Sequence, residues 1–182
     1  MNKPLKTILI SALATVSAFS AITYTSCNRD KCKTIVCANG GVCNDGACNC
    51  PSGYGGPTCE TTSRDKFLGE WQVFEKGSNT NASQYSVSVA PANIVTDVVI
   101  SKFYNYFVAN IRGTIVGDTI YIPNQQLEGK VVFGKGYIYT DVTYGQYGNI
   151  SLSYEVIDTA TNVPDDFGYY APDGSAPSQW NK

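Results

Sequence analysis

The feature that most constrains this chain is the placement of its cysteines. All seven lie between Cys27 and Cys59, and the rest of the 182-residue sequence contains none. Disulfides form in oxidising compartments and are rare in the cytosol, so this clustering indicates a small crosslinked module in an exported protein. About 30 residues bury too little apolar surface to fold alone, so crosslinks must hold such a module together. In the chain-entropy model, each short disulfide loop contributes roughly 3 kcal/mol.

The first 26 residues have the composition of a signal peptide (1–26). Lys3 and Lys6 give a positive end, and the stretch from Ile8 to Ile22 is apolar and rich in Ala and Ser. This stretch has fewer apolar residues than the roughly 20 that a membrane-spanning helix needs. A short membrane anchor that stays attached is the alternative interpretation.

Cys27 accounts for the odd number of cysteines, because it directly follows the signal segment. The sequence Tyr24-Thr25-Ser26-Cys27 resembles a bacterial lipobox, in which a cysteine receives diacylglycerol and becomes the new N-terminus; Tyr24 stands where Leu is usual. The resemblance implies that residues 27–31 are a lipidated N-terminus and short tether on the outer membrane, surface-exposed or periplasmic. Each buried CH₂ contributes about 0.8 kcal/mol, so two or three acyl chains anchor stably. A free or intermolecular thiol is the alternative.

The other six cysteines are separated by turn signals. Spacing alone leaves many disulfide pairings open. Gly40 and Gly41 precede Cys43, and Asn44-Asp45-Gly46 is a hairpin-turn signal. The glycines around Tyr54 permit a tight bend before the last cysteine.

Residues 32–60 resemble an EGF-like domain, with the short third-to-fourth cysteine loop of tenascin-type repeats. The resemblance implies the disulfides Cys32–Cys43, Cys37–Cys48 and Cys50–Cys59. A zinc site is the alternative, but the chain has no histidine and the compartment is oxidising. Lys31 occupies the position where calcium-binding members carry an acidic or amide ligand, and an ammonium repels the ion. We therefore expect no calcium here and no cofactor elsewhere.

After a polar linker at 61–66, the sequence changes to the short alternating runs of β-strands. Tyr85, Val87 and Val89 alternate with serines, which gives one apolar and one polar face. Gly117-Asp118 joins two such runs as a tight hairpin. The pattern predicts an all-β antiparallel domain over 67–158, either a barrel or a sandwich. The predicted strands are 69–76, 84–90, 94–103, 106–116, 119–123, 130–134, 136–143 and 149–157.

Gly69-Glu70-Trp71 at the start of this domain resembles the Gly-x-Trp opening of lipocalin-like barrels, in which the tryptophan closes one end of the barrel. The resemblance implies an up-and-down barrel of about eight strands, with Gly69 and Trp71 as its structural motif. The arginine that usually follows the last strand, and the C-terminal helix, have no clear counterpart. An eight-stranded barrel is filled by side chains or holds one small ligand.

Little in the sequence points to catalysis. Without histidine, Ser–His and Cys–His chemistry is excluded, and we expect no enzyme activity. A carboxylate-based carbohydrate-active enzyme is an alternative, since two acidic side chains about 5–9 Å apart suffice for glycoside hydrolysis. The candidate carboxylates are Glu70, Glu75, Glu128, Asp141 and Glu155. With 13 basic and 15 acidic residues and no basic stripe, nucleic acid is not expected as a partner.

Tyrosines are the best indication of binding. The chain has 13, most of them after position 84, and exposed tyrosines offer large contact area at low entropic cost. Tyr104, Tyr106, Tyr144 and Tyr147 lie near predicted loops and are the candidate ligand-binding residues. Ordinary strand propensity is the alternative explanation. The polar and aromatic C-terminal tail, 159–182, is either disordered or packs its aromatics across one end of the barrel.

These observations favour a lipid-anchored cell-envelope protein with a non-enzymatic recognition role. Its partner would be a protein or a glycan, contacted through the EGF-like module and the tyrosine-rich domain. A barrel that carries a small apolar ligand is the first alternative, and the carboxylate enzyme is the second. Oligomeric state and the identity of the ligand are left open by the sequence.

Overall fold

The computed structural model describes residues 31–139, 148–170 and 175–182 and consists almost entirely of β-strands. Within these ranges no helix is long and apolar enough to cross a membrane. The signal segment, Cys27, Asp141, Tyr144 and Tyr147 lie outside the described residues. The N-terminal elements are β1 (Val42–Asn44), β2 (Ala47–Asn49), β3 (Tyr54–Gly55), β4 (Thr61–Thr62) and the 3₁₀ turn η1 (Asp65–Phe67).

The N-terminal module, residues 31–62, is held by three disulfides. They are Cys32–Cys43, Cys37–Cys48 and Cys50–Cys59, the same pairs that the EGF-like resemblance implies. β1 and β2 form the expected hairpin, in which Cys43 lies opposite Cys48. Asp45 and Gly46 both have positive φ, of 50° and 90°, which is the geometry of a tight two-residue hairpin turn.

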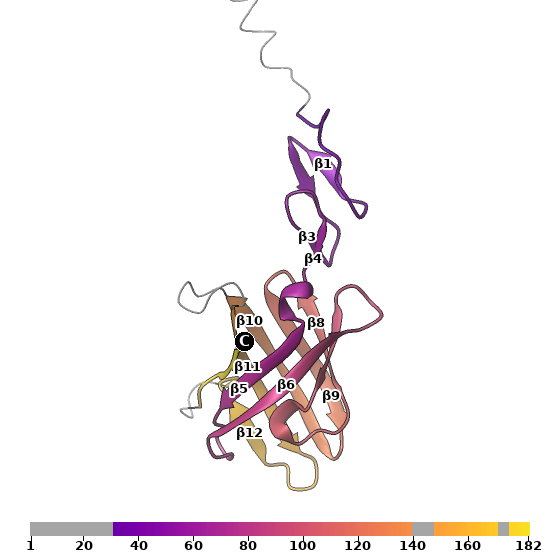
Figure 1. The fold of residues 1–182 in the computed structure, drawn as a ribbon. Helices are drawn as coiled ribbons and strands as arrows, with labels where there is room; N and C mark the ends of the chain where they lie inside the picture. Colours follow the sequence, from indigo (N-terminus) through magenta and orange to yellow (C-terminus); the bar gives the residue numbers. More distant parts are fainter. Residues whose placement is uncertain (1–30, 140–147, 171–174) are drawn as a thin grey trace, which may run out of the picture.

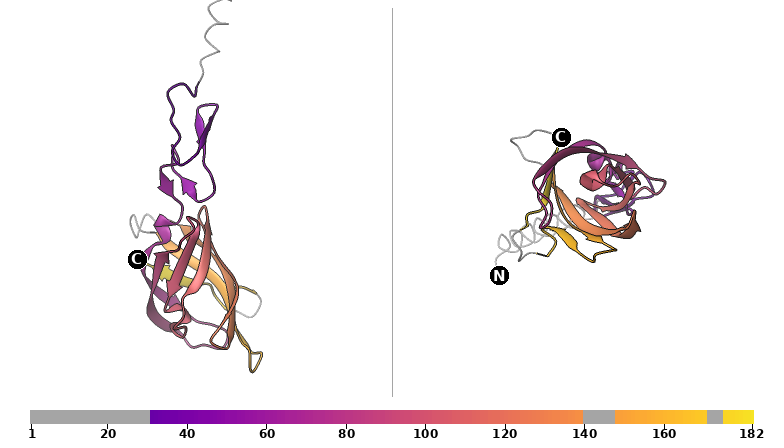
Figure 2. Two further views of the ribbon diagram at one scale, coloured as in Figure 1. Left: turned by 90° about the vertical axis from the view of Figure 1, so that its right-hand side faces the viewer. Right: turned by 90° about the horizontal axis from the view of Figure 1, so that it is seen from below.

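The second domain is a closed antiparallel barrel of eight strands, as predicted (Figure 1). β5 to β10 pair in sequence order, β10 pairs β11, and β13 closes the ring between β11 and β5. Figure 2 shows the closed ring along its axis. A short strand, β12, pairs with the other half of β11. The elements are β5 (Gly69–Glu75), β6 (Ser83–Pro91), β7 (Asp97–Ser101), η2 (Phe103–Asn105), β8 (Ile111–Val116), β9 (Thr119–Leu127), β10 (Lys130–Tyr139), β11 (Asn149–Asp158), β12 (Pro164–Phe167) and β13 (Ser178–Asn181).

Two predicted strands, 130–134 and 136–143, are one continuous strand in the described part of the chain. Gly134 and Gly136 mark no turn; they lie opposite Tyr154 and Leu152 on β11. A Cβ on Gly134 would lie 2.4 Å from the Cβ of Tyr154, and one on Gly136 would lie 2.8 Å from a methyl of Leu152. These glycines therefore make room for large inward-facing side chains instead of reversing the chain.

The C-terminal segment is part of the barrel, which corrects the predicted domain boundary at residue 158. β13 supplies the closing strand, and its Trp180 is almost fully buried. The predicted strand 106–116 begins only at Ile111, because η2 and the turn after it fold Phe103 and Phe107 into the core. Four residues are too few to show a period of two, which explains why the sequence pattern missed β13.

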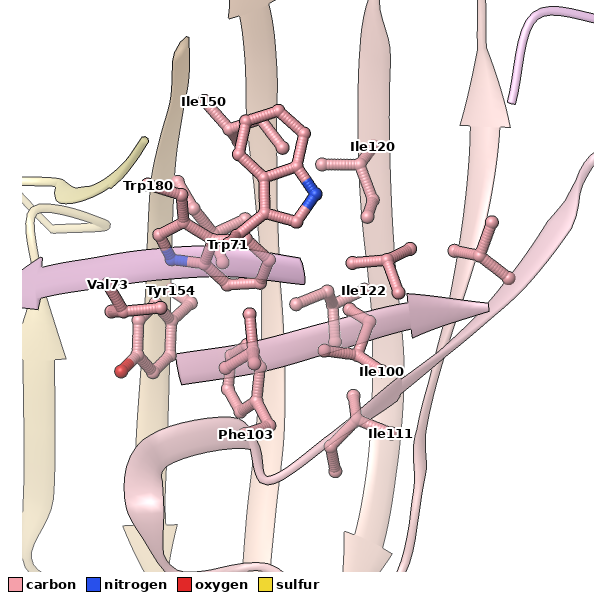
Figure 3. Packing of buried hydrophobic residues seen from close by; sticks show 14 of the residues in the cluster. Trp71, Val73, Ile100, Phe103, Ile111, Ile120, Ile122, Ile150, Tyr154 and Trp180 are labelled. Carbon is pink, nitrogen blue, oxygen red and sulfur yellow. The ribbon is translucent and has the colours of Figure 1, made fainter. Parts of the chain in front are cut away.

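Large side chains fill the inside of the barrel (Figure 3). Trp71 is fully buried, and its Nε1 donates to the backbone carbonyl of Phe67 at 2.7 Å. The Nζ of Lys182, just after the last strand, lies 4.7 Å from the centroid of the Trp71 ring and donates to the carbonyl of Leu68 at 2.6 Å. Such a cation–π contact stabilises by about 0.5–2 kcal/mol.

The N-terminal module lies at the end of the barrel where β5 begins (Figure 1). Arg64 joins the two parts, because its guanidinium donates to the carbonyls of Ala92 and Ile94, both at 2.8 Å, and of Asp97 at 3.2 Å. Lys66 forms an ion pair with Asp118 in the β8–β9 turn. A depression of about 450 Å³ lies in the same region. Three of the residues that line it, Ala92, Ile94 and Asp97, already accept hydrogen bonds from Arg64 through their backbone carbonyls.

Candidate functional site

The structure brings two of the four candidate tyrosines together at the end of the barrel opposite the module. Tyr104 in η2 and Tyr106 just after it have ring centroids 6.4 Å apart. Tyr104 is half-buried and its hydroxyl donates to the Oδ2 of Asp165 at 2.9 Å. Tyr106 is half-exposed, and the Nζ of Lys130 lies 4.8 Å from its ring centroid. Tyr144 and Tyr147 lie outside the described residues, so they are not placed.

Beside Tyr104 the barrel end is hollowed into a basin of about 300 Å³. Its walls combine carboxylates, hydroxyls, one amide and one ammonium with a few apolar side chains. The lining residues are Asn79, Thr80, Tyr104, Lys130, Val156, Asp158, Thr161, Val163, Pro164 and Asp165.

Asp165 is the best-held polar group of the basin. This nearly buried carboxylate accepts hydrogen bonds from the backbone N–H of Asn79 at 2.8 Å, from the hydroxyl of Thr80, and from Tyr104. Burial raises the pKa of Tyr104 to about 12, with Asp165 adding to the shift, so the phenol remains a protonated donor at neutral pH. Asp165 is not a predicted site residue, because its segment has the polar composition of a chain end and is predicted to be part of the tail.

Asp158 and Lys130 form the other charged pair of the basin, with Nζ and Oδ2 3.1 Å apart. Asp158 also accepts from the backbone N–H groups of Ala160 and Thr161, both at 3.0 Å, and so holds the β11–β12 turn. The backbone hydrogen bond from Thr161 and the bond from Lys130 lower the pKa of Asp158 to about 2. The carboxylate is therefore charged throughout the physiological range.

Deeper inside the barrel, Glu75 is surrounded by hydroxyl groups. Its carboxylate accepts from Tyr85 at 2.6 Å, Tyr154 at 2.9 Å and Ser178 at 2.6 Å. Burial raises the pKa of Glu75, although the three hydroxyls act in the opposite direction, and nearby Asp165 raises it further. Because these donors occupy the carboxylate, the arrangement anchors β5, β6, β11 and β13 to one another.

The carboxylates proposed for glycoside hydrolysis are not gathered in one described cleft. Glu70 is exposed on β5, while Glu128 accepts from the backbone N–H groups of Val108 and Ala109, at 3.0 and 2.7 Å. Glu155 is buried on β11 opposite Asp166. Among the described residues, no group of three or more Asp, Glu, Cys or His side chains is arranged to hold a metal ion.

A second candidate site covers the outside of β9 and β10. Tyr121, Tyr137 and Tyr139 point outward and are 44%, 51% and 45% exposed. Tyr121 lies opposite Lys135, one step diagonally from Tyr137, and Tyr139 is two residues further along the same strand face. Such diagonal and alternate neighbours are about 7 Å apart. The three side chains therefore form one contiguous surface, which we call the outer tyrosine face.

The aromatic surface continues to the segment after β12. The ring of Tyr169 packs edge-on against Phe133 of β10, with centroids 5.1 Å apart, and Tyr170 packs on Tyr169 at 4.9 Å. Asp166 holds this segment by accepting from the backbone N–H groups of both tyrosines, at 3.1 and 2.9 Å. Phe133 and Tyr139 are about 20 Å apart along β10, which gives the approximate length of this aromatic surface.

Neither a protein-family model nor a curated protein matches this chain. Its function is therefore inferred from these two sites and from the amino-acid sequence that precedes the module.

Proposed function

We propose that the chain is a lipid-anchored protein of the bacterial cell envelope that binds a partner protein without catalysing a reaction. In this proposal the signal peptide is removed, Cys27 carries the lipid, and the EGF-like module separates the membrane from a lipocalin-like barrel. Three disulfides support export to an oxidising compartment. Lys182 on Trp71 supports the lipocalin-like resemblance, because it fills the place of the arginine that usually follows the last strand.

The observation that carries the proposal is the outer tyrosine face. Three half-exposed tyrosines lie on neighbouring strands of a rigid barrel, and the tyrosine pair after β12 extends the surface. Tyrosine is enriched at protein interfaces, because its ring gives contact area while few rotatable bonds are lost. A strand face of this kind presents its side chains with little ordering cost on binding.

Site-specific photo-crosslinking in the native bacterium tests this face. A benzoylphenylalanine at Tyr137 should capture a defined protein, whereas the same group at Phe74 should not. Phe74 is a suitable control because it is exposed to a similar degree and lies on the outside of β5, across the barrel from β9. A glycan adduct at Tyr137 would change the class of partner. Equal crosslinking at both positions would refute the proposal.

The anchor is tested separately. Cells fed a labelled fatty acid should incorporate it into the wild-type chain but not into Cys27→Ser. The Cys27→Ser variant should also leave the membrane fraction. If wild-type protein carries no label and is found free in the medium, lipid anchoring is wrong, while partner binding through the outer tyrosine face can still be correct.

Carriage of a small apolar ligand is the second candidate function. The basin beside Tyr104 favours a small ligand, but polar groups make up much of its lining. The space between the strands is occupied by residues such as Trp71, Trp180 and Tyr154. An apolar ligand inside the barrel would have to displace them, and densely packed cores resist such displacement.

A further inference from the structure

We infer that the basin at the far end of the barrel binds one uncharged sugar unit, such as the end of a glycan chain. This site is separate from the outer tyrosine face and does not depend on the proposed partner protein. Its volume of about 300 Å³ is at the small end of the range for ligand pockets, roughly 300–1,000 Å³. Its chemistry and its position in the molecule point to this ligand class.

The lining offers donors and acceptors side by side. Lys130 supplies an ammonium, Thr80 and Thr161 supply hydroxyls, and Asp158 and Asp165 supply carboxylate oxygens. Val156, Val163 and Pro164 form apolar walls between these groups. A sugar ring matches this combination, since each hydroxyl both donates and accepts while the ring carbons present an apolar surface. An entirely apolar ligand would remove the Lys130–Asp158 ion pair from water and offer it no hydrogen bond in return, at a cost in affinity.

The charges argue against an ionic ligand. The basin is lined by two carboxylates and one ammonium, so its net negative charge would repel an anionic ligand. The position best suited to a cation, between the ring of Tyr106 and the carboxylate of Asp158, is already occupied by Lys130. Burial of Asp165 under three hydrogen bonds also fixes its orientation before any ligand arrives. An uncharged hydroxylated ligand is what these groups can pair with.

The elements that carry the lining residues of the basin lie at the end of the barrel farthest from the module (Figure 1). The chain enters the barrel beside η1 and β5, while η2, β12 and the turn that follows β11 surround the other end. The orientation of this end depends on the proposed lipid anchor at Cys27, which would leave it facing away from the membrane. A basin in that position is accessible to the end of a glycan that approaches from outside.

The experiment uses the full chain, expressed in a bacterial host with its own N-terminal segment and purified in mild detergent. Saturation-transfer NMR and calorimetry would screen glucose, galactose, mannose and N-acetylglucosamine, with glucuronate and glucosamine as charged counterparts. A ligand of this size should bind with a dissociation constant of about 1 mM. At least one neutral sugar should bind about tenfold more tightly than either charged counterpart.

Variants locate the binding. Val163→Trp places a large ring over the basin from an exposed position and should abolish binding, as should Thr161→Trp. Val108→Trp is the matched control, since Val108 is 91% exposed at the same end of the barrel and is not in the lining. Unchanged thermal unfolding would establish that the variants are folded. Binding of no sugar, tighter binding of glucuronate, or full binding by both blocking variants would overturn the inference.

Discussion

The hydroxyl groups around Glu75 allow one substitution to be worked through quantitatively. Tyr154→Phe removes a single hydrogen bond to the carboxylate and leaves the ring, which stacks on Phe167 at a centroid distance of 4.3 Å. A hydrogen bond to a charged group contributes about 1.5–3 kcal/mol net. We therefore expect the free energy of unfolding to fall by about that amount. For a protein of this size, the melting temperature should drop by roughly 4–10 °C.

Urea unfolding followed by tryptophan fluorescence measures this change directly. The chain has two tryptophans, and both Trp71 and Trp180 are buried in the barrel, so their emission reports on its core. Tyr121→Phe is the matched control, because it removes the same atom from an exposed tyrosine and should change stability by less than about 0.5 kcal/mol. Should Tyr154→Phe prove as stable as this control, the hydroxyls would not be what holds Glu75 in place.

The pH dependence of the free energy of unfolding provides a second test of the site around Glu75. Burial raises the pKa of Glu75 in the folded protein above the ordinary value of 4.5. Its contribution is then complete below the unfolded pKa and is lost as pH rises through the folded pKa. Glu75→Gln removes this loss, so the stability of wild type relative to Glu75→Gln should fall as pH increases from 4.5. A constant difference across this range would show that the pKa is unshifted.

Three further predictions concern other parts of the chain. Gly134→Ala should destabilise the barrel by about 1–3 kcal/mol in thermal unfolding, because its Cβ would overlap Tyr154; equal stability would mean that β11 yields there. Asp158→Asn should make the free energy of unfolding depend less on pH between 3.8 and about 2. The low pKa of Asp158, about 2, contributes stability that wild type loses as pH falls through this range. The same pH dependence in wild type and Asp158→Asn would contradict this. Arg64→Met should let the module reorient independently of the barrel, seen as divergent ¹⁵N relaxation rates in the two parts; a single tumbling time would mean that other contacts suffice.

The fold was largely predictable because its signals are local. Short turns such as Asp45-Gly46 and Gly117-Asp118 depend on two residues, and alternating strands such as 84–90 show their buried face directly in the sequence. β13 and the continuity of β10 depend instead on which distant strand lies opposite. The sequence around Gly134 predicts a turn, and only the pairing with Tyr154 on β11 shows that the glycine lies within a strand.

The candidate site was predictable only in part for the same reason. Of the candidate tyrosines near loops, Tyr104 lines the basin and Tyr106 packs beside it, while a binding role for either stays a prediction. Asp165 meets Thr80 and Tyr104, which come from the other side of the barrel, only because the barrel closes. Tyr121, Tyr137 and Tyr139 lie inside strands, where strand propensity alone explains a tyrosine, so nothing local set them apart.

The closing strand also determines when this protein can fold. β13 pairs with β5, so the first and last barrel strands can meet only after residues 178–181 have been synthesised. Contacts so distant in sequence slow folding, because the intervening loop must be ordered first. The same arrangement makes the C-terminus a poor place for a fusion tag, since Lys182 already lies on Trp71.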